Sequence, residues 1–333
     1  MVHNVISSQS LLVVGSVAFD TLEMPYGTFE YVVGGAATFS SIAASLVTRG
    51  VRIVGVVGDD FPEDFLDFLR KRNVDTLGVE RVPGKSFFWR GRYSDDLMSR
   101  ETLDTQLNVF ANFQPKIPES HRSTPYVLLG NIHPQLQLDV LDQVGGQVGG
   151  QVGRPKLVAA DTMNFWISGE SATLGKLLAR TDLLIINDEE ARQLSGIHNI
   201  ARAAQDIRKR GPSQLIIKRG EFGALLFDDD GTFFCPGFPL EEVRDPTGAG
   251  DTFAGGLLGY VARQADPGAA KVSSLTLRRG MVYASALASF CVEDVGTTRI
   301  AKVTREELDT RVQAFARLVD YGGSLTLPAE EGR

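Results

Sequence analysis

An alternation of short apolar runs with longer amphipathic stretches is the feature of this sequence that most constrains its fold. Leu11–Val14 and Arg52–Val57 are rich in β-branched residues, and the stretches Ala36–Val47 and Pro62–Arg72 have helical length. Runs this apolar are typical of strands that are buried on both faces, as in a parallel sheet covered by helices. The sequence therefore predicts an α/β fold in which a mostly parallel central sheet lies between two layers of helices.

The same alternation returns beyond residue 125. It predicts strands at 126–129, 156–160, 182–186, 214–218, 224–227 and 232–235, and helices near 135–143, 171–180, 249–263, 275–292 and 305–319. A chain of 333 residues permits one or two domains. We expect a single domain spanning 1–333 with a small appendage.

Two regions interrupt this alternation. The first comprises residues 21–33 and about 79–110, which we expect to form a small β lid. Within it, Phe87–Tyr93 alternates polar and apolar residues like an exposed antiparallel ribbon. The second is the tandem Gly-Gly-Gln-Val repeat at 144–153, for which we expect a flexible surface insertion without chemistry. The Gly-rich, acidic tail at 321–333 is expected to fray.

Composition argues against several classes of function. The net charge is −7 and no dense run of Lys or Arg occurs, which speaks against nucleic acid as a partner. The apolar stretch Leu11–Phe19 is too short for a signal peptide or a membrane span, so we expect no membrane partner. Cys235 and Cys291 are the only cysteines, which suits a reducing cytoplasm. The four histidines are scattered without metal-ligand spacing.

Candidate functional residues gather in Arg244–Gly256, where a loop turns into an apolar helix. Gly248, Ala249 and Gly250 are small, and the first amides of a helix lack partners, so this turn can bind an anion such as phosphate. Asp251 falls in the first helical turn, where a carboxylate can take the proton from a hydroxyl that attacks phosphorus. The alternative is that Asp251 only caps the helix and the glycines only turn the chain.

Two other phosphate-binding motifs do not match. A dinucleotide fingerprint needs glycine where Phe253 stands, and a Walker loop ending at Gly84-Lys85-Ser86 needs glycine where Val79 stands.

Taken as a whole, Asp245–Gly256 resembles the C-terminal signature of the PfkB, or ribokinase-like, family of carbohydrate and nucleoside kinases. The resemblance extends from about residue 11 to about residue 320, and further elements follow in family order: Gly15–Asp20, Gly34-Gly35, Asn187–Glu190 and Lys218–Gly223. It implies a ribokinase-like three-layer α/β/α fold with a small β lid. It also implies transfer of the γ-phosphoryl group of Mg²⁺-ATP to a hydroxyl of a sugar, nucleoside or related polyol.

On the acceptor side, the resemblance implies that Asp20 binds substrate hydroxyls and that Gly34 and Gly35 form the hinge between lid and main domain. Asp251 would be the general base, and the amides of Gly248, Ala249 and Gly250 the anion hole. The alternatives are that Asp20 caps a helix or pairs with a charge in the lid, and that the two glycines only form a tight turn.

On the nucleotide side, the resemblance implies that Asn187 and Glu190 position magnesium and phosphate, Glu190 through water. The alternative is that these two residues form a capping box. The residues implied to border ATP are Lys218, Gly220, Gly223 and Thr247; for Lys218 the alternative is a solvated strand end. A monovalent-cation site, for K⁺, is implied near Asp245 and Thr247.

Two departures from the family concern the acceptor. Ala18 and Phe39 stand where ribokinase-type members carry asparagines. The loss of two amides and the gain of a phenyl ring at Phe39 favour a more apolar or planar acceptor, such as the base of a nucleoside. A cyclitol such as myo-inositol is the alternative acceptor, and ribose itself becomes less favoured.

A catalytically silent ligand-binding or regulatory protein on the same fold is the alternative to a kinase. The intact Gly-Ala-Gly segment and Asp251 favour the kinase, because a silent protein has no need of the base. The expected partners are then ATP and a small-molecule acceptor. The oligomeric state, monomer or homodimer, stays open, because the segment between Asp20 and Gly34 is short for a full lid.

Overall fold

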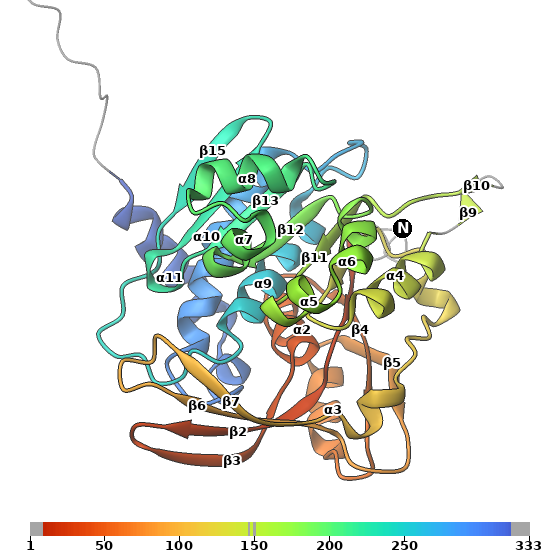
Figure 1. Ribbon diagram of the computed structural model, residues 1–333, viewed down its shortest axis with the longest axis vertical. Helices are drawn as coiled ribbons and strands as arrows, with labels where there is room; N and C mark the ends of the chain where they lie inside the picture. The colour runs from red at the N-terminus through yellow and green to blue at the C-terminus, as the bar shows by residue number, and fades with distance from the viewer. Residues whose placement is uncertain (1–8, 146, 149–150, 321–333) are drawn as a thin grey trace, which may run out of the picture.

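A central sheet of nine strands organises the computed structural model, which describes residues 9–145, 147–148 and 151–320 (Figure 1). In spatial order the strands are β15 (Gly231–Cys235), β14 (Ala224–Asp228), β13 (Gln214–Lys218), β12 (Leu183–Asn187), β11 (Leu157–Ala160), β8 (Tyr126–Leu129), β1 (Ser10–Val14), β4 (Gly50–Val57) and β5 (Val74–Arg81). Neighbouring strands run parallel from β13 to β5, and β14 is antiparallel to both of its neighbours. The predicted mostly parallel sheet is confirmed.

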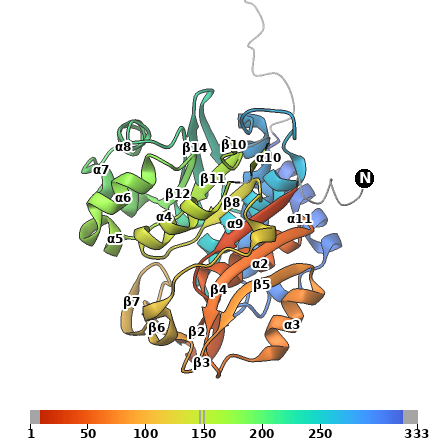
Figure 2. The same ribbon diagram turned by 90° about the vertical axis from the view of Figure 1, so that its right-hand side faces the viewer.

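Helices cover both faces of this sheet (Figure 2). One face carries α2 (Ala36–Ser45), α3 (Glu63–Lys71), α9 (Ala249–Gln264), α10 (Ser274–Cys291) and α11 (Arg305–Leu318). The other face carries α4 (Pro134–Gln143), α5 (Asn164–Gly169), α6 (Ser171–Leu178), α7 (Asp188–Ser195) and α8 (Ile200–Arg208). The predicted three-layer architecture is confirmed. Helices α5, α7 and α8 are additional to the predicted helix ranges, although the capping box considered for Asn187 and Glu190 implies a helix at α7.

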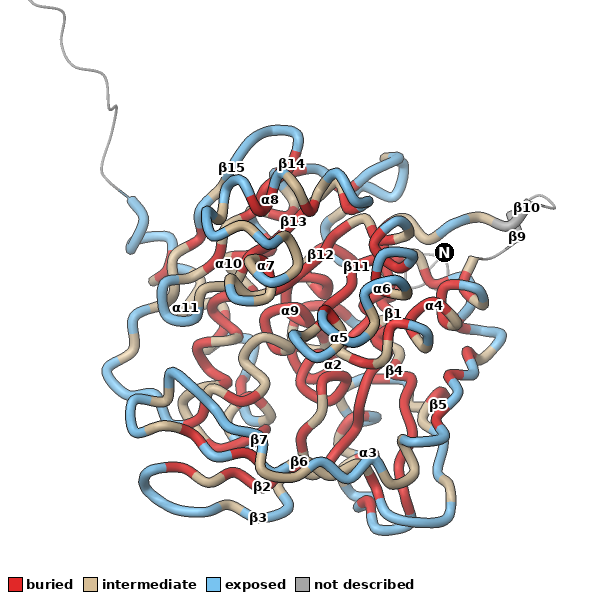
Figure 3. The backbone as a smooth tube through the Cα atoms, viewed as in Figure 1, coloured by how far each residue is buried: buried red, intermediate tan, exposed pale blue. Residues whose placement is uncertain are grey.

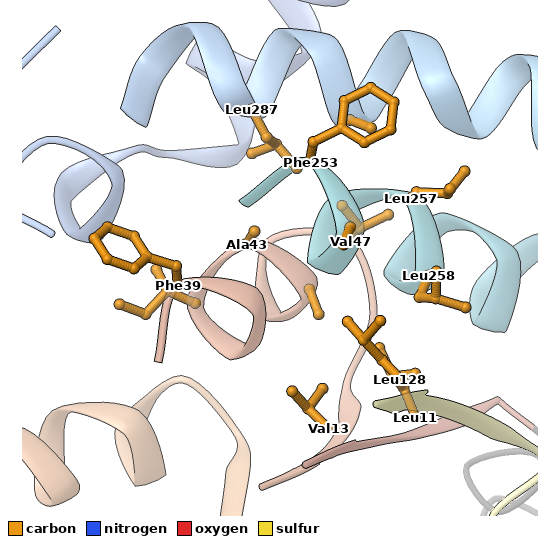
Figure 4. Close-up of a cluster of buried hydrophobic side chains, with 14 of the residues drawn as sticks. Leu11, Val13, Phe39, Ala43, Val47, Leu128, Phe253, Leu257, Leu258 and Leu287 are labelled. Carbon is orange, nitrogen blue, oxygen red and sulfur yellow. The ribbon is translucent and has the colours of Figure 1, made fainter. Parts of the chain in front are cut away.

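The strands are apolar throughout because both of their faces lie in hydrophobic cores. All five residues of β1 are buried (Figure 3). Leu11 and Val13 contribute to the core under α2 and α9, whereas Leu12 and Val14 contribute to the core on the opposite face. In the first core, α2 and α9 pack side by side over β1, with Phe39, Phe253 and Leu257 among their core residues (Figure 4). This packing fixes where α9 begins relative to the sheet.

A separate sheet of four strands lies beyond one end of the central sheet (Figure 1). In spatial order it contains β3 (Gly27–Gly34), β2 (Ala18–Met24), β6 (Phe87–Tyr93) and β7 (Arg100–Gln106). These strands correspond to the expected lid, with different bounds: β2 begins before residue 21, and Val79–Arg81 pair with β4 of the central sheet. The expectation of an exposed antiparallel ribbon at Phe87–Tyr93 is half correct, because β6 pairs antiparallel with β7 but parallel with β2.

Short elements complete the described chain. They are the 3₁₀ helices η1 (Asn108–Asn112), η2 (Glu119–His121), η3 (Gly220–Phe222) and η4 (Ile300–Lys302), and the strands β9 (Gln147–Val148) and β10 (Gln151–Val152), which pair antiparallel. Residues 146, 149 and 150 of the Gly-Gly-Gln-Val repeat and the whole tail at 321–333 lie outside the described residues. Among the described helices, none is long and apolar enough to span a membrane.

Candidate active site

Polar residues gather where the parallel strands of the central sheet end. Lys218 is the last residue of β13, Asn187 is the last residue of β12, and Asp161 directly follows β11. The carboxyl ends of neighbouring parallel strands share one edge of a sheet, so side chains far apart in sequence meet there. Helix α9 begins at the same edge. Its residue Gly250 lies beside Lys218, since a Cβ atom added to Gly250 would be 2.9 Å from Nζ of Lys218.

The N-terminus of α9 has the turn that the sequence predicts. Gly248 is the N-cap residue, with a φ of 74°, a left-handed conformation that glycine adopts without strain. The amide of Ala249 donates to the carbonyl of Pro246 at 3.3 Å, whereas the amides of Gly250 and Asp251 donate to no backbone carbonyl of the described residues. Of the three amides expected to bind an anion, that of Ala249 is therefore engaged, whereas those of Gly248 and Gly250 donate to no backbone carbonyl of the described residues. The amide of Asp251 is open as well.

Asp251 lies in the first turn of α9, as predicted. Its backbone carbonyl accepts a hydrogen bond from Oγ of Ser40 at 2.9 Å, but within the described chain its carboxylate accepts none. Burial and the charge of Asp161 raise the pKa of Asp251 to about 6, against the opposing effect of Lys218. A carboxylate with this pKa is matched to accept a proton near neutral pH.

Lys218 is a buried cation rather than a solvated strand end. Its side chain is 18% exposed, and its Nζ lies 3.4 Å from Oδ2 of Asp161. Burial alone lowers the pKa of a lysine, but Asp161, Glu190 and Asp251 together raise the pKa of Lys218. The ammonium group therefore stays charged among three carboxyl groups. Gly220 and Gly223 lie in the turn that follows, which joins β13 to β14 through η3.

Asn187 and Glu190 form the capping box that the sequence allows as an alternative. Oδ1 of Asn187 accepts from the amide of Glu190 at 2.8 Å, and Oε2 of Glu190 accepts from the amide of Asn187 at 2.8 Å. Burial and the charge of Asp161 also raise the pKa of Glu190 to about 7, while Lys218 lowers it. Glu190 thus caps α7 and faces the charged cluster at the sheet edge.

Asp20 lies on β2 of the four-stranded sheet. It is 6% exposed, and among the described residues no donor bonds to its carboxylate. Burial, followed by the charges of Asp245 and Asp251, raises the pKa of Asp20 to about 7. A buried carboxylate without a donor can accept hydrogen bonds from hydroxyl groups of a ligand, since an unmet acceptor is costly.

The diglycine supports this placement of Asp20. A Cβ at Gly34 would overlap Oδ2 of Asp20, so only glycine leaves room for the carboxylate. Gly35 is the N-cap of α2 with a φ of 97°, and a Cβ there would lie 2.5 Å from the carbonyl oxygen of Ser16. The two glycines therefore hold Asp20 beside the start of α2.

Phe39 has a different position from the one expected of an acceptor-binding residue. Its side chain is 1% exposed, and a Cβ at Gly248 would lie 2.5 Å from its ring. A ring this buried has almost no surface to offer an acceptor. The ring of Phe39 instead packs against Gly248, in the loop that precedes α9.

Asp245 and Thr247 anchor that loop. Asp245 is fully buried, and its carboxylate accepts from the amides of Thr247 at 2.8 Å and Gly296 at 2.7 Å. The hydroxyl of Thr247 lies 2.7 Å from the hydroxyl of Tyr93 on β6. Both oxygens of Asp245 are thus used by backbone amides, so this side chain fits a structural anchor better than a ligand for K⁺.

Sequence reasoning missed three residues that the structure brings to this site. Asp161 follows a buried strand, as Asn187 does, but belongs to no motif; its position alone was the available signal. Tyr93 contacts Thr247, and Arg100 lowers the pKa of both Asp20 and Asp251. These two residues lie in the four-stranded sheet, whose pairing the sequence does not reveal.

The charged cluster fits magnesium bound with a nucleotide. Asp161, Glu190 and Asp251 offer oxygen ligands and leave negative charge that Lys218 only partly balances. In the part of the chain that the structure describes, no group of three or more acidic, histidine or cysteine side chains forms a ready metal cage. The carboxylates of Asp161, Glu190 and Asp251 are of the oxygen-ligand type that can contact hydrated Mg²⁺ alongside phosphate oxygens and water.

Comparisons with known proteins agree with this geometry. Residues 160–304 match the model of the pfkB family carbohydrate kinases. A cytidine kinase of Thermococcus kodakarensis is 30% identical over 256 residues, which cover 76% of this chain and 88% of that protein.

Solved structures have the same fold at lower identity. A nucleoside kinase of Burkholderia thailandensis in complex with inosine has a TM-score of 0.67 at 21% identity, over 92% of this chain and 96% of that one. An Escherichia coli protein assigned as ribokinase II, in complex with ATP and Mg²⁺, has a TM-score of 0.72 at 18% identity, over 92% and 99%. The chain therefore belongs to the pfkB family of carbohydrate kinases and is a phosphotransferase whose acceptor group is a hydroxyl.

Proposed function

We propose that this chain is a nucleoside kinase that transfers the γ-phosphoryl group of Mg²⁺-ATP to a hydroxyl of the sugar. The observation that carries this proposal is that the buried Asp251 interacts electrostatically with two groups of the site: with Lys218, which lies beside Gly250 at the start of α9, and with Asp20 on β2. The cytidine kinase and the inosine complex among the similar proteins support a nucleoside as acceptor. Two free, buried cysteines suit the reducing cytoplasm that we propose for it.

In this mechanism Asp20 accepts hydrogen bonds from acceptor hydroxyls and orients one of them toward phosphorus. Such orientation supplies much of the rate enhancement of a phosphoryl transfer, because little covalent chemistry is left to the protein. Asp251 then takes the proton of the attacking hydroxyl. Its pKa of about 6 leaves it ionised at neutral pH, so it is ready as a base.

The open amides of Gly250 and Asp251 and the ammonium group of Lys218 stabilise the negative charge on the transferred group. Asp161 holds the ammonium group of Lys218 in place at 3.4 Å. Glu190 and Asn187 at the start of α7 would hold Mg²⁺ through water, and that ion would neutralise the phosphate charge of ATP. The four-stranded sheet would act as a lid that moves about Gly34-Gly35 and excludes water during transfer.

The proposal is tested by a screen for acceptor-dependent ADP formation. Nucleosides, free sugars and cyclitols including myo-inositol are each supplied with Mg²⁺-ATP, with and without K⁺. We expect a nucleoside to give the highest kcat/KM. A higher value for a free sugar or for myo-inositol contradicts the nucleoside assignment. Ligand binding that raises thermal stability without any ADP formation supports the silent binding protein instead.

Substitution of Gly34 tests the role of Asp20. In Gly34→Ala the new methyl group displaces the Asp20 carboxylate, and we expect the KM for the acceptor to rise at least about tenfold, since a lost charged hydrogen bond costs roughly 1.5–3 kcal/mol. Steady-state kinetics measures this. The matched control is Gly175→Ala in α6, where an added Cβ has no neighbouring atom within 4 Å. In this control, kcat and the KM for the acceptor should stay at wild-type values. An unchanged acceptor KM in Gly34→Ala argues against Asp20 as the acceptor ligand.

The pH profile tests the base. The raised pKa of Asp251 means that its basic form is present above about pH 6 and is lost as the pH falls through that value. We therefore expect kcat/KM to fall with decreasing pH through about 6, approaching a tenfold loss for each further unit. Measurements from pH 5 to 9 check this. A profile that is flat between pH 5 and 7 is incompatible with Asp251 as the general base.

A further inference from the structure

Tyr93 links the four-stranded sheet to the loop that starts α9. It is the last residue of β6, and its hydroxyl lies 2.7 Å from the hydroxyl of Thr247. Both residues are only 7% exposed. The ring of Tyr93 belongs to a small hydrophobic core with Leu22 and Met24 of β2 and with Val295, which follows α10. The hydrogen bond therefore lies inside the contact between the sheet and the main domain, where water does not readily replace it.

Thr247 is held from two directions. Its backbone amide donates to the carboxylate of Asp245 at 2.8 Å, so the main domain fixes the backbone of the loop. The side chain of Thr247 is bound by Tyr93, from the four-stranded sheet. Gly248, the next residue, is the left-handed N-cap from which α9 begins. A displacement of Thr247 would therefore displace the open amides that follow it.

The strand that carries Tyr93 is paired with the strand that carries Asp20. Strand β6 runs parallel to β2, and Asp20 is opposite Trp89, on the same strand as Tyr93. Strands joined by a ladder of hydrogen bonds move as one body when a domain closes. A movement of this sheet would therefore shift Asp20 and the hydroxyl of Tyr93 together.

We propose that Tyr93 is a positioning residue for phosphoryl transfer, which acts through Thr247 to hold the start of α9 in its active arrangement. This inference rests on the proposed kinase function. Tyr93 exchanges no proton and no atom with the substrates. Its hydroxyl fixes the loop so that the open amides of Gly250 and Asp251 point at the transferred group, and a small misalignment of such donors is costly. Because Asp20 belongs to the same sheet, the amides would be aligned in the position of the sheet that holds the acceptor.

The test is a double-mutant cycle that removes the two hydroxyl groups one at a time. Tyr93→Phe and Thr247→Val each delete the hydrogen bond and keep most of the side-chain volume, so the test stands even if one of them does not fold. We expect each variant to lower kcat about tenfold, while the KM for ATP stays within about twofold of wild type. The variant that carries both changes should lose no more kcat than the worse single variant, because the shared bond can be lost only once.

Tyr26→Phe is the matched control. Tyr26 lies in the turn between β2 and β3 of the same sheet, and its hydroxyl donates to the carbonyl of Arg244 at 2.5 Å, in the same loop. Tyr26 is 44% exposed, so water can replace the lost bond, and kcat should stay within about threefold of wild type.

Wild-type kcat in Tyr93→Phe overturns the inference, as does a double variant in which the two single losses multiply. A loss confined to the KM for the acceptor also overturns it, because Tyr93 would then contact the acceptor. Calorimetry with Mg²⁺-ADP and aluminium fluoride, a mimic of the phosphoryl group in flight, needs neither acceptor nor turnover. Tyr93→Phe should weaken binding of this mimic about tenfold and leave the affinity for Mg²⁺-ADP alone unchanged. If wild type forms no ADP with any acceptor, the proposed function fails. Equal affinities of wild type and Tyr93→Phe for the mimic then overturn the inference as well, whereas a weaker affinity of the variant supports it.

Discussion

Replacing Asp251 by asparagine is expected to lower acceptor-dependent turnover by about 10²- to 10⁴-fold, the range that a positioned general base contributes. Asparagine has nearly the shape of aspartate, so the start of α9 and its open amides should persist. The affinity for Mg²⁺-ATP should therefore change little. Rapid-quench or coupled ADP assays measure the loss, and calorimetry with an ATP analogue measures the affinity. Asp229→Asn is the matched control, since this aspartate has a side chain that is 80% exposed.

The same variant should be more stable than wild type at alkaline pH. The raised pKa of Asp251 means that the folded state binds its proton more tightly than the unfolded chain does. Ionised Asp251 therefore destabilises the fold above about pH 6, and asparagine removes that cost. We expect a higher thermal midpoint for Asp251→Asn at pH 8 and a smaller difference at pH 5. A variant that melts earlier at pH 8, or that turns over at nearly the wild-type rate, would remove Asp251 from the role of buried base.

Replacing Lys218 by methionine is expected to lower kcat/KM for ATP by about 10²- to 10³-fold. Methionine keeps most of the volume of the side chain, but it leaves Asp161, Glu190 and Asp251 without their central cation. Without Lys218, the three carboxyl groups repel an incoming phosphate. Removal of Lys218 also leaves Asp161 as a buried charge without its partner, which is strongly unfavourable. The loss should appear in the affinity for the ATP analogue as well as in kcat.

A second consequence separates Lys218 from a merely structural lysine. The charge of Lys218 lowers the pKa of Asp251 and of Glu190, so its removal should move the acid limb of the pH profile to higher pH. Lys176→Met on α6 is the control, because Lys176 is exposed and lies at the end of a helix on the outer layer. If Lys218→Met retained wild-type kcat/KM and an unshifted acid limb, the buried ammonium would have no part in phosphate binding.

Much of the site follows from local rules that act within a short segment. Gly248 at a left-handed N-cap, Asp251 in the first turn of α9, and the capping box of Asn187 and Glu190 all depend on residues a few positions apart. Backbone conformation and helix capping are local properties, and a single sequence is sufficient to predict them. The opposite case is Phe39, whose position in the motif suggested an acceptor contact. Its ring lies under Gly248 instead, because the packing of α2 against α9 decides which way it points.

By itself, the sequence determined the layered fold and the glycine turn that starts α9. Strands buried on both faces must be apolar at every position, and a helix that begins with small residues and an aspartate has open amides beside a carboxylate. Only the tertiary structure decided which distant charges share the site. Asp161 and Lys218 meet because β11 and β13 end at one edge of the sheet, and Arg100 lies on the same face of the four-stranded sheet as Asp20 because β6 pairs with both β2 and β7. Strand order and register arise from contacts between segments far apart in the chain, so no local pattern of residues records them.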